Sequence, residues 1–430
     1  MDDRLKKFAA QVRGPLLLSV LAAQLAAASP REALWVWNTD QLVARPDLRD
    51  TLLLVRDSLK VRDVFLYLPH RFVFKGDSLS CLFQQEDSLI ATVRWASEHG
   101  FRVYALAGEP EWSLPSYRRY AEAFVRAVLD LNRRPPDALF SGIHLDVEPY
   151  LLIQFASPVL RTRLYESIVQ LHKHLAGLVH ADPVLEYGAD VPFWMIDSVR
   201  VDGRIATVAE LILRSADHVA VLVYRDHAEG PNGIVELAAR HVVMAEKLGK
   251  RIYLGIETQE LRFQEFRFIL GRSEQDFRTS LEAPFCEIPW KVETGERVAA
   301  LDVFGSVHVG IQRSAPFSEL VRIALCLGNP MVRLDTVFVH RKLDDLRFWA
   351  RNLGEWENPH IDTVIELKGK LYQVVSMSEK PLPRVTFFEE SFAELRAEME
   401  KVDSAFVGHP GFGGIAVHDF AGAANLILRE

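Results

Sequence analysis

The chain has 430 residues, more than the about 250 of a single (β/α)8 barrel, so one barrel with a sizeable extra module is the simplest division. Hydrophobic residues make up 49% of the chain and charged residues 25%, which excludes a disordered or fibrous protein. The formal net charge is -8 and no basic cluster is interleaved with aromatic residues, so nucleic acid is not expected as a partner.

Residues 1–28 have the layout of a signal peptide. Four basic residues within the first 13 precede an apolar run over residues 15–28 that ends in three alanines. This run is shorter than the about 20 residues of a membrane span, so we expect its cleavage and export to the periplasm or outside the cell. Membrane contact is expected only through this segment, if it stays uncleaved. The alternative is an amphipathic helix packed on the barrel, which Asp2, Asp3 and Gln24 favour.

Eight short β-rich runs alternate with helical patterns, and this alternation predicts a parallel sheet. The runs cover residues 34–38, 64–68, 101–106, 142–148, 184–188, 219–224, 252–256 and 414–418. Five helices are expected between them, at residues 89–99, 116–131, 161–178, 235–248 and 389–406. Because the first seven units have the ordinary size of βα repeats, an α/β fold of the closed (β/α)8 type is expected.

The interval between the seventh and eighth runs is far too long for one βα unit. It predicts an inserted α+β module over residues 259–383, which leaves residues 29–258 and 384–430 for the barrel. Strand-like runs within it cover residues 298–304, 307–311, 336–340, 363–367 and 371–375, and Lys368-Gly-Lys370 predicts a hairpin turn between the last two. Because the insertion leaves from a strand end on the active face, we expect a lid or a partner-binding module.

Cys81, Cys286 and Cys326 are odd in number and far apart in the sequence. Their spacing favours neither a disulfide framework nor a metal or redox pair, so we expect buried apolar side chains. No cofactor is expected.

Polar residues at the carboxyl ends of the barrel strands are the candidates for chemistry, because these ends face a common pocket. They are Asn38, His70, Glu109, Glu111, Asp146, Glu148, Asp190, Tyr224, Asp226, Glu257, His418 and Asp419.

The fourth strand carries the strongest signal. His144, Asp146 and Glu148 alternate with apolar residues, so all three lie on one face of the strand. Because unpaired buried charges are costly, this pattern indicates a functional site, the alternative being a polar network that stabilises the barrel. We expect Asp146 and partial burial to raise the pKa of Glu148, which suits a general acid that cleaves glycosidic bonds. Glu257 is the candidate second carboxylate, or else a solvated turn residue.

Four tryptophans near the strand ends offer flat apolar faces to a sugar ring: Trp35, Trp37, Trp112 and Trp194. Any one of them has the alternative of a core position.

Segments of four expected barrel strands resemble those of a known family. Ser141-Gly-Ile-His-Leu-Asp-Val-Glu148 resembles the Asp-Gly-x-Asp-x-Asp-x-Glu motif on the fourth strand of family 18 glycoside hydrolases, the chitinase-like barrels. Three segments are similar to the sixth, seventh and eighth strands of that family: Val221-Leu-Val-Tyr-Arg-Asp226, Tyr253-Leu-Gly-Ile256 and Gly413-Gly-Ile-Ala-Val-His-Asp419. The resemblance covers the barrel in chain order and leaves out the insertion.

The resemblance implies that Glu148 is the acid/base, that Asp146 orients an N-acetyl group of the substrate, and that Tyr224 helps to hold the cyclised intermediate. Three positions depart from the family: Ser141 and His144 stand where it has aspartate, and His418 stands where a tryptophan usually floors the sugar site. These departures bear on specificity for N-acetylhexosamines.

A second, partial resemblance concerns retaining glycosidases of the large (β/α)8 clan. Glu148-Pro149 together with Glu257 resembles their pair of carboxylates on strands four and seven, although Val147 stands where an asparagine usually precedes the first glutamate.

The leading hypothesis is a glycoside hydrolase acting on an oligo- or polysaccharide outside the cytoplasm, with Glu148 as acid/base and Asp146, Tyr224 and Glu257 assisting. The residues expected to contact the sugar are Trp37, His144, Trp112, Asp190, Trp194, Asp226 and His418.

Two alternatives belong to other classes. A carbohydrate-binding barrel without catalysis is favoured by the departures at His144 and His418. A metal-dependent hydrolase would use His70, Asp190, His227 and His418, but the His-x-His and His-Glu-x-x-His spacings are absent, so no metal site is expected.

Overall fold

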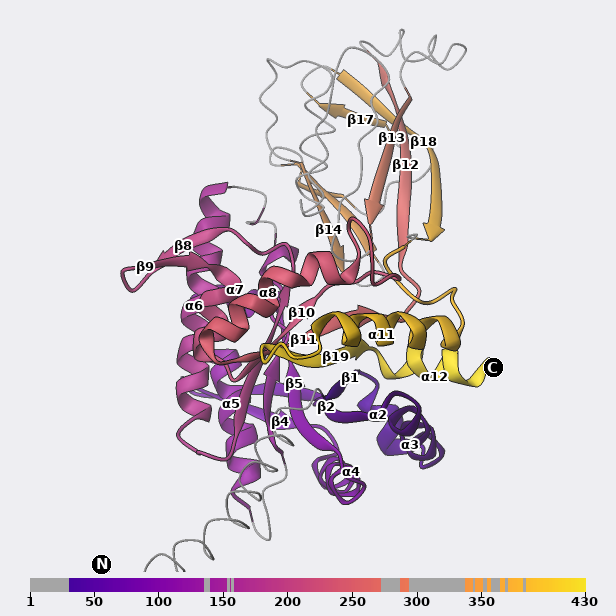
Figure 1. Cartoon of the computed structure of the whole chain (residues 1–430). Coiled ribbons are helices and arrows are strands. Elements are labelled where there is room, and N and C mark those ends of the chain that lie inside the picture. Colours follow the sequence, from indigo (N-terminus) through magenta and orange to yellow (C-terminus); the bar gives the residue numbers. More distant parts are fainter. Residues whose placement is uncertain are drawn as a thin grey trace, which may run out of the picture.

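The computed structural model describes residues 31–134, 140–152, 155, 158–271, 287–293, 337–342, 345–350, 354–356, 364–367, 370–381 and 384–430. Eight parallel strands close into a barrel at the centre of this part of the chain (Figure 1). In chain order they are β1 (Glu32–Val36), β2 (Val61–Tyr67), β5 (Arg102–Ala107), β6 (Gly142–Leu145), β7 (Glu186–Pro192), β10 (His218–Leu222), β11 (Arg251–Glu257) and β19 (Phe412–His418). Each strand pairs with its neighbour in chain order, and β1 closes on β19. The predicted (β/α)8 barrel is confirmed.

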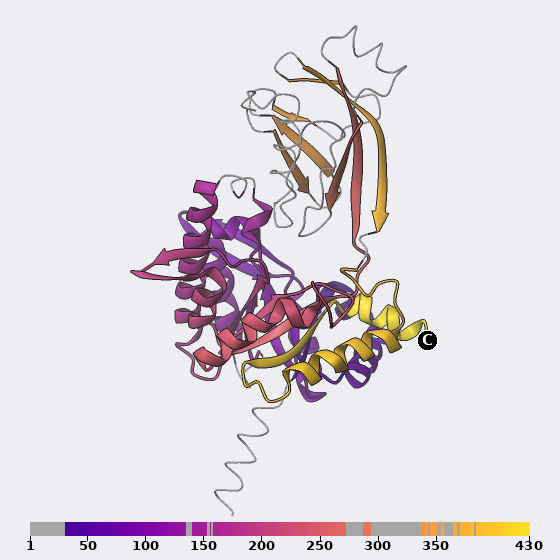
Figure 2. The ribbon, with the colours of Figure 1, turned by 45° about the horizontal axis from the view of Figure 1, so that its top comes forward.

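Helices surround the barrel in both views (Figures 1 and 2). The α-helices are α2 (Thr39–Ala44), α3 (Asp47–Leu59), α4 (Glu86–Glu98), α5 (Arg118–Asn132), α6 (Pro158–Val179), α7 (Val208–Ser215), α8 (Ile234–Leu248), α11 (Phe392–Phe406) and α12 (Phe420–Leu428). Local sequence sets several of their starts. Ser391 and Glu394 form a capping box at α11, and Thr207 caps α7 by accepting from the amide of Glu210.

Short elements decorate the loops between the strands and helices. They are the hairpin of β3 (His70–Lys75) and β4 (Ser78–Phe83), the hairpin of β8 (Ser198–Val201) and β9 (Arg204–Thr207), and the 3-10 turns η1 (Pro110–Ser113) and η2 (Pro149–Leu151). Among the residues that the structure describes, no helix is long and apolar enough to cross a membrane.

The fifth barrel strand lies further along the chain than its sequence pattern predicts. Val184, at the predicted start, is 71% exposed, and the ladder begins where the amide of Glu186 donates to the carbonyl of Ser141. The strand continues to Pro192, so Asp190 lies within β7, opposite Ala220, and not after the strand. This correction places the Asp190 side chain inside the barrel.

The described residues of the insertion between β11 and β19 form antiparallel sheets. One sheet has the order β13 (Glu287–Glu293), β12 (Arg262–Gly271), β18 (Lys370–Pro381), β17 (Val364–Leu367), and the other contains β14 (Val337–Lys342), β15 (Asp345–Ala350) and β16 (Gly354–Trp356). Figures 1 and 2 show β12 and β18 extending away from the barrel.

The structure confirms the hairpin of β17 and β18 and the strand β14, whereas the sequence pattern missed β12, β13, β15 and β16. Several predictions fall on residues outside those described: the signal peptide, the strands at 298–304 and 307–311, and the burial of Cys286 and Cys326. Cys81 is buried as expected, and burial raises the pKa of its thiol to about 12.

A buried carboxyl at the start of the barrel leads to a prediction on stability. Glu32 accepts a hydrogen bond from the amide of Ile415 at 2.6 Å. Burial first, and the charge of Asp403 second, raise the pKa of Glu32 from 4.5 to about 8. The folded state therefore binds a proton more tightly than the unfolded state, and stability falls as the pH rises from 4.5 to 8.

We therefore expect Glu32→Gln to stabilise the protein at alkaline pH, because the amide keeps the acceptor for Ile415 without a charge. The free energy of unfolding should rise by about 1–3 kcal/mol at pH 8 and change little at pH 4.5. Denaturant unfolding at both pH values measures this, with the exposed Glu98→Gln as control. An equal effect of Glu32→Gln at both pH values would contradict the assignment.

Candidate active site at the carboxyl end of the barrel

Asp146 and Glu148 lie directly beyond the end of β6, and both side chains are partly buried. The amide of Asp146 donates to the carbonyl of Ala107 at 3.0 Å, which continues the barrel ladder past the end of the strand. Gly108 makes this close approach possible, since a Cβ there would lie 1.7 Å from the backbone oxygen of Asp146. The ends of β5 and β6 thus fix the backbone that carries both carboxylates at the carboxyl ends of the strands, the barrel mouth.

Tyr150 orients Glu148. Its hydroxyl donates to Oε1 of Glu148, and its ring is 3% exposed on the turn η2. The ring packs edge to face against Trp194, with 5.2 Å between centroids, and Trp194 also contacts Phe155. Trp194 therefore supports Glu148 through Tyr150, while its partly exposed side chain leaves the predicted sugar contact open.

Removal of this hydroxyl has a specific expected effect. Tyr150→Phe keeps the ring packing but removes the hydroxyl that binds Oε1 of Glu148. A hydrogen bond to a charged group contributes about 1.5–3 kcal/mol, so we expect a turnover number roughly tenfold or more lower, with KM little changed. Steady-state kinetics on a cleaved oligosaccharide measures this. A raised KM at an unchanged turnover number would instead indicate that Tyr150 binds substrate.

Asp146 has a carboxyl partner from the neighbouring strand. The side chains of Asp146 and Asp190 are hydrogen-bonded, and Asp190 also accepts from the indole N–H of Trp35 at 3.2 Å. Burial raises the pKa of Asp190 well above its usual value, although the hydrogen bonds with Trp35 and Asp146 act against this shift. The protonated form of Asp190 is thereby favoured, and only a protonated carboxyl can donate a hydrogen bond to another carboxylate.

The partly exposed His418 and the buried Glu257 form a second pair at the barrel mouth. Glu257 is 2% exposed, and its Oε2 accepts from Nδ1 of His418 at 2.9 Å. Burial lowers the pKa of His418, but the Glu257 carboxylate outweighs burial and raises it. Trp37 acts in the opposite direction, because its indole N–H donates to Nε2 at 2.8 Å and needs a free lone pair there. In this arrangement the ring carries one proton, on Nδ1, held by Glu257.

Both oxygens of Glu257 are occupied. Oε1 accepts from the backbone amides of Thr258 and Gln259 at 2.8 and 2.6 Å, and Oε2 binds His418. A nucleophile must be reachable by the sugar, and this buried carboxylate is not. The geometry therefore favours a positioning role for Glu257, in place of the expected second catalytic carboxylate.

Three aromatic side chains surround His418 and remain partly exposed. Trp37 lies 6.2 Å from the His418 ring and 5.7 Å from Tyr67, measured between centroids, and Tyr224 lies 5.9 Å from His418. They come from the residue after β1, the last residue of β2 and the segment after β10. We call them the mouth aromatics. They bring the predicted residues Trp37, Tyr224 and His418 together and offer flat apolar faces of the kind that sugar rings pack against.

Three predicted ligand contacts, and Trp35 as a further candidate face for a sugar, are buried instead. Trp35 is 1% exposed and fills the barrel interior, and Trp112, 2% exposed, packs against Phe124. His144 is fully buried, and so is the side chain of Asp190. These side chains are therefore not exposed at the mouth in this structure, and His144 lies on β6, two residues before Asp146.

The remaining polar candidates have other partners. Asp226 pairs with His227 at 2.6 Å, and Asp419 caps α12 by accepting from the amide of Gly422. His70 binds the carbonyl of Leu68 through Nδ1. Within the described part of the chain, no group of three or more His, Cys, Asp or Glu side chains could hold a metal. The metal-dependent hydrolase therefore has no support from these residues.

Sequence reasoning missed Tyr67, Tyr150 and His218. Tyr67 is the next-to-last residue of a predicted strand, so its position near the mouth was available from the pattern. Tyr150 stands on a turn after Pro149, and His218 lies 74 residues from the His144 ring that it contacts. Only the closed barrel brings His218 and His144 together.

No protein-family model matches the sequence, and no curated protein is similar to it. Among solved structures, the chain is similar to a chitinase from Chromobacterium violaceum, at 10% identity over 94% of this chain and 100% of that chain, with a TM-score of 0.40. An Ostrinia furnacalis Group II chitinase catalytic domain 2, in complex with penta-N-acetylchitooctaose, matches at 12% identity over 90% and 89%, with a TM-score of 0.40. The Bacillus cereus spore cortex-lytic enzyme SleL matches at 8% identity over 93% and 74%, with a TM-score of 0.39. The fold itself, a closed (β/α)8 barrel, follows from the strand order of this chain.

Proposed function

We propose that this protein is a glycoside hydrolase that cleaves an oligo- or polysaccharide outside the cytoplasm, with Glu148 as general acid/base. The observation that carries the proposal is the pair of carboxylates beyond β6. Glu148 is oriented by the buried Tyr150, and Asp146, two residues earlier, is hydrogen-bonded to Asp190. A carboxyl fixed at the mouth of a (β/α)8 barrel is the group that protonates a leaving glycosidic oxygen.

The route of cleavage depends on which group at the barrel mouth can act as the nucleophile. Because Glu257 is buried and fully hydrogen-bonded, a protein carboxylate is not offered by β11 as nucleophile. The family resemblance of the Asp146 and Glu148 segment supplies another route, in which an N-acetyl group of the substrate attacks the anomeric carbon. Asp146 then orients that group, Tyr224 holds the cyclised intermediate, and Glu148 first donates and later recovers the proton.

The substrate class follows from the same residues. We infer a β-linked sugar with an N-acetyl group, bound against the mouth aromatics. Asp190 supplies the carboxyl partner of Asp146, so that histidine at position 144 does not leave Asp146 without one. Trp37, hydrogen-bonded to His418, offers an indole face at the floor of the site.

The experiment is a panel of β-linked N-acetylglucosamine, glucosamine and glucan oligosaccharides, with reducing ends and calorimetric heat followed together. Turnover of the N-acetylated oligosaccharides alone is the expected result. Turnover of glucan oligosaccharides would overturn the N-acetyl route but keep the hydrolase. The absence of both binding heat and turnover with every member of the panel would reject the proposal.

A carbohydrate-binding barrel without catalysis is the second candidate. It is favoured by His418 at the position where the resembled family has its floor tryptophan. Heat of binding without reducing ends, in both the wild type and a Glu148 variant, is the outcome that would select it.

Export remains part of the proposal and has its own test. Residues 1–28 are expected to be removed during secretion. Mass spectrometry of the protein recovered outside the cytoplasm should find the mature N-terminus close to residue 29. An intact N-terminus on cytoplasmic protein would contradict export.

A further inference from the structure

A line of buried polar side chains runs through the barrel from the mouth toward its other end. Asp190, the partner of Asp146, contacts Nε2 of His144 through Oδ1 at 2.8 Å. Nδ1 of His144 in turn lies 3.1 Å from Nε2 of His218. Four side chains from β7, β10 and the β6 segment thus form one continuous hydrogen-bonded series.

Both histidine rings are enclosed by apolar and aromatic groups. His144 is fully buried and stacks on Phe65 at 3.8 Å between centroids, and His218 is 4% exposed. Burial lowers the pKa of each ring to about 3, so both are neutral imidazoles. Gly188 makes room for them, since a Cβ there would lie 2.1 Å from the His218 ring and 2.5 Å from the His144 ring.

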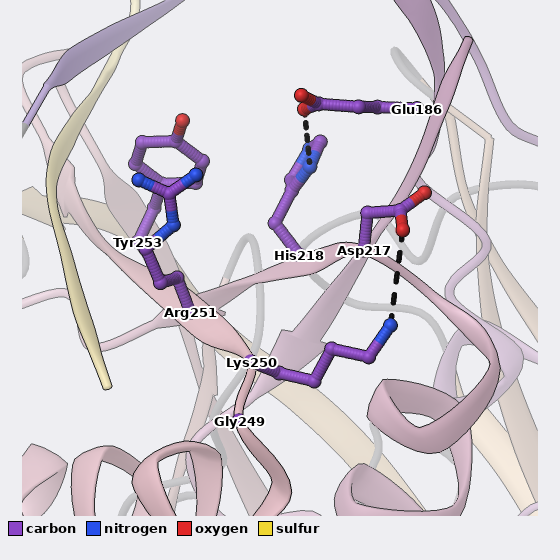
Figure 3. Close-up of a pocket in the computed structure, with 7 residues that line it drawn as sticks. All are labelled: Glu186, Asp217, His218, Gly249, Lys250, Arg251 and Tyr253. Carbon is purple, nitrogen blue, oxygen red and sulfur yellow. Dashed lines mark ion pairs between the residues drawn. The ribbon is translucent and has the colours of Figure 1, made fainter. Parts of the chain in front are cut away.

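His218 ends the series at the amino ends of the strands, the barrel base. It lines a pocket of about 280 Å³ together with Glu186, Asp217, Gly249, Lys250, Arg251 and Tyr253 (Figure 3). Nδ1 of His218 lies 3.8 Å from Oε2 of Glu186, a partly exposed carboxylate held by Arg102 at 2.6 Å. The His218 end of the series therefore faces a polar, water-accessible pocket at the barrel base, on the side of the barrel away from Glu148.

We propose that Asp190, His144 and His218 form a proton relay that connects Asp146 at the barrel mouth with the pocket at the barrel base. The relay rests on the proposed function in one respect, which is that Asp146 is the catalytic group it serves. Such a relay supplies or stores one proton without opening the mouth to water.

Each transfer balances within the series. The hydroxyl of Asp190 gives its proton to Asp146 and receives the Nε2 proton of His144. In the same concerted shift, His144 takes the Nε2 proton of His218 on Nδ1, and His218 takes a proton from the pocket on its own Nδ1. One proton enters at the base, one reaches Asp146, and each ring ends in its other neutral tautomer. The reverse shift returns the proton, so no imidazolium forms.

Charged and titratable groups from other elements face this series. They are Asp63 on β2, Arg102 and Tyr104 on β5, His172 on α6, Glu186 on β7, Asp217 before β10, Tyr253 on β11 and His418 on β19. Arg102 pairs with Glu186 and lies 3.6 Å from Asp63. Because these charged groups pair with one another, the neutral rings of His144 and His218 are the route from the barrel base to the mouth.

The first test needs no substrate. In protein labelled with ¹⁵N-histidine, NMR follows exchange of the His144 ring proton with solvent. We expect His218→Gln, whose amide can keep the bond to His144 but cannot change tautomer, to slow this exchange by about tenfold or more. His218→Leu, which removes the bond, should do the same. His241→Leu is the matched control, because His241 is another buried neutral histidine, on α8 and outside the series.

Unchanged exchange in both folded His218 variants would overturn the relay. An infrared carbonyl band of a protonated carboxyl that disappears in Asp190→Asn supports it, and persistence of that band in Asp190→Asn speaks against it. These measurements do not depend on catalysis.

The activity measurement separates the relay from the proposed function. On a cleaved oligosaccharide, His218→Gln should lower the turnover number about tenfold, with KM unchanged and a larger solvent isotope effect. A wild type without any turnover rejects the hydrolase, while the exchange data still decide on the relay. Normal turnover in His218→Gln, with slowed exchange of the His144 ring proton, would overturn the claim that the relay supplies Asp146 with protons during catalysis.

Discussion

Replacement of Glu148 by glutamine is expected to lower turnover of the cleaved oligosaccharide by about 10²–10⁴-fold while binding stays near that of the wild type. The amide has the shape of the carboxyl and can accept from the hydroxyl of Tyr150, so the side chain should keep its place. It cannot give a proton to the leaving oxygen. Reducing-end assays measure the loss, and calorimetry on the same oligosaccharide measures binding.

Glu111→Gln is the control for this variant. Glu111 is a partly exposed carboxyl on η1, beyond the carboxyl end of β5, so the charge change occurs on the same side of the barrel. We expect activity close to that of the wild type. If Glu148→Gln kept a tenth of the wild-type turnover, the acid/base would have to be another residue, and the assignment would fail.

Removal of the Glu257 side chain is expected to lower the free energy of unfolding, because Glu257 has a positioning role. Glu257→Ala leaves the Nδ1 proton of His418 and the amides of Thr258 and Gln259 without their acceptor in a buried site. Breaking a buried pair in this way destabilises a protein by about 3–5 kcal/mol. Denaturant unfolding measures the change, and the exposed Glu109→Ala should stay within about 0.5 kcal/mol of the wild type.

Glu257→Gln separates charge from shape at the same position. The amide oxygen can serve the two backbone donors, but the amide N–H turns toward Nδ1 of His418 and forces that proton onto Nε2. There it opposes the indole N–H of Trp37, so we expect a loss of about 1–2 kcal/mol and altered Trp37 fluorescence.

A catalytic role for Glu257 would give the opposite pattern. Wild-type stability in Glu257→Ala, with turnover lost and then restored by added azide or formate, would make this carboxylate the nucleophile. That outcome would replace the N-acetyl route by a mechanism with two protein carboxylates.

The two resemblances drawn from the sequence differ in whether the carboxylates they require are exposed at the barrel mouth. The resemblance that pairs Asp146 with Glu148 has both side chains at the mouth, with Tyr150 and Asp190 as partners. The resemblance that pairs Glu148 with Glu257 needs a carboxylate that is 2% exposed and fully hydrogen-bonded. Burial, and not distance along the chain, distinguishes them.

The sequence by itself determined the barrel, its eight strands and the strand that carries the candidate acid. These follow from local rules: strands alternate with helices, and polar residues at strand ends lie at the mouth. The same alternation singled out the segment of Asp146 and Glu148, which lies directly beyond β6. The hairpin of β17 and β18 followed from a turn signal of equally short range.

Only the tertiary structure decided which polar and aromatic residues reach the mouth. Asp190 was predicted to follow its strand and lies within it, and Trp35 and Trp112 fill the interior. His144 meets His218, 74 residues away, across Gly188. The physical reason is that closure of the sheet sets the stagger between neighbouring strands. That stagger fixes how deep each side chain lies, and no local pattern encodes it.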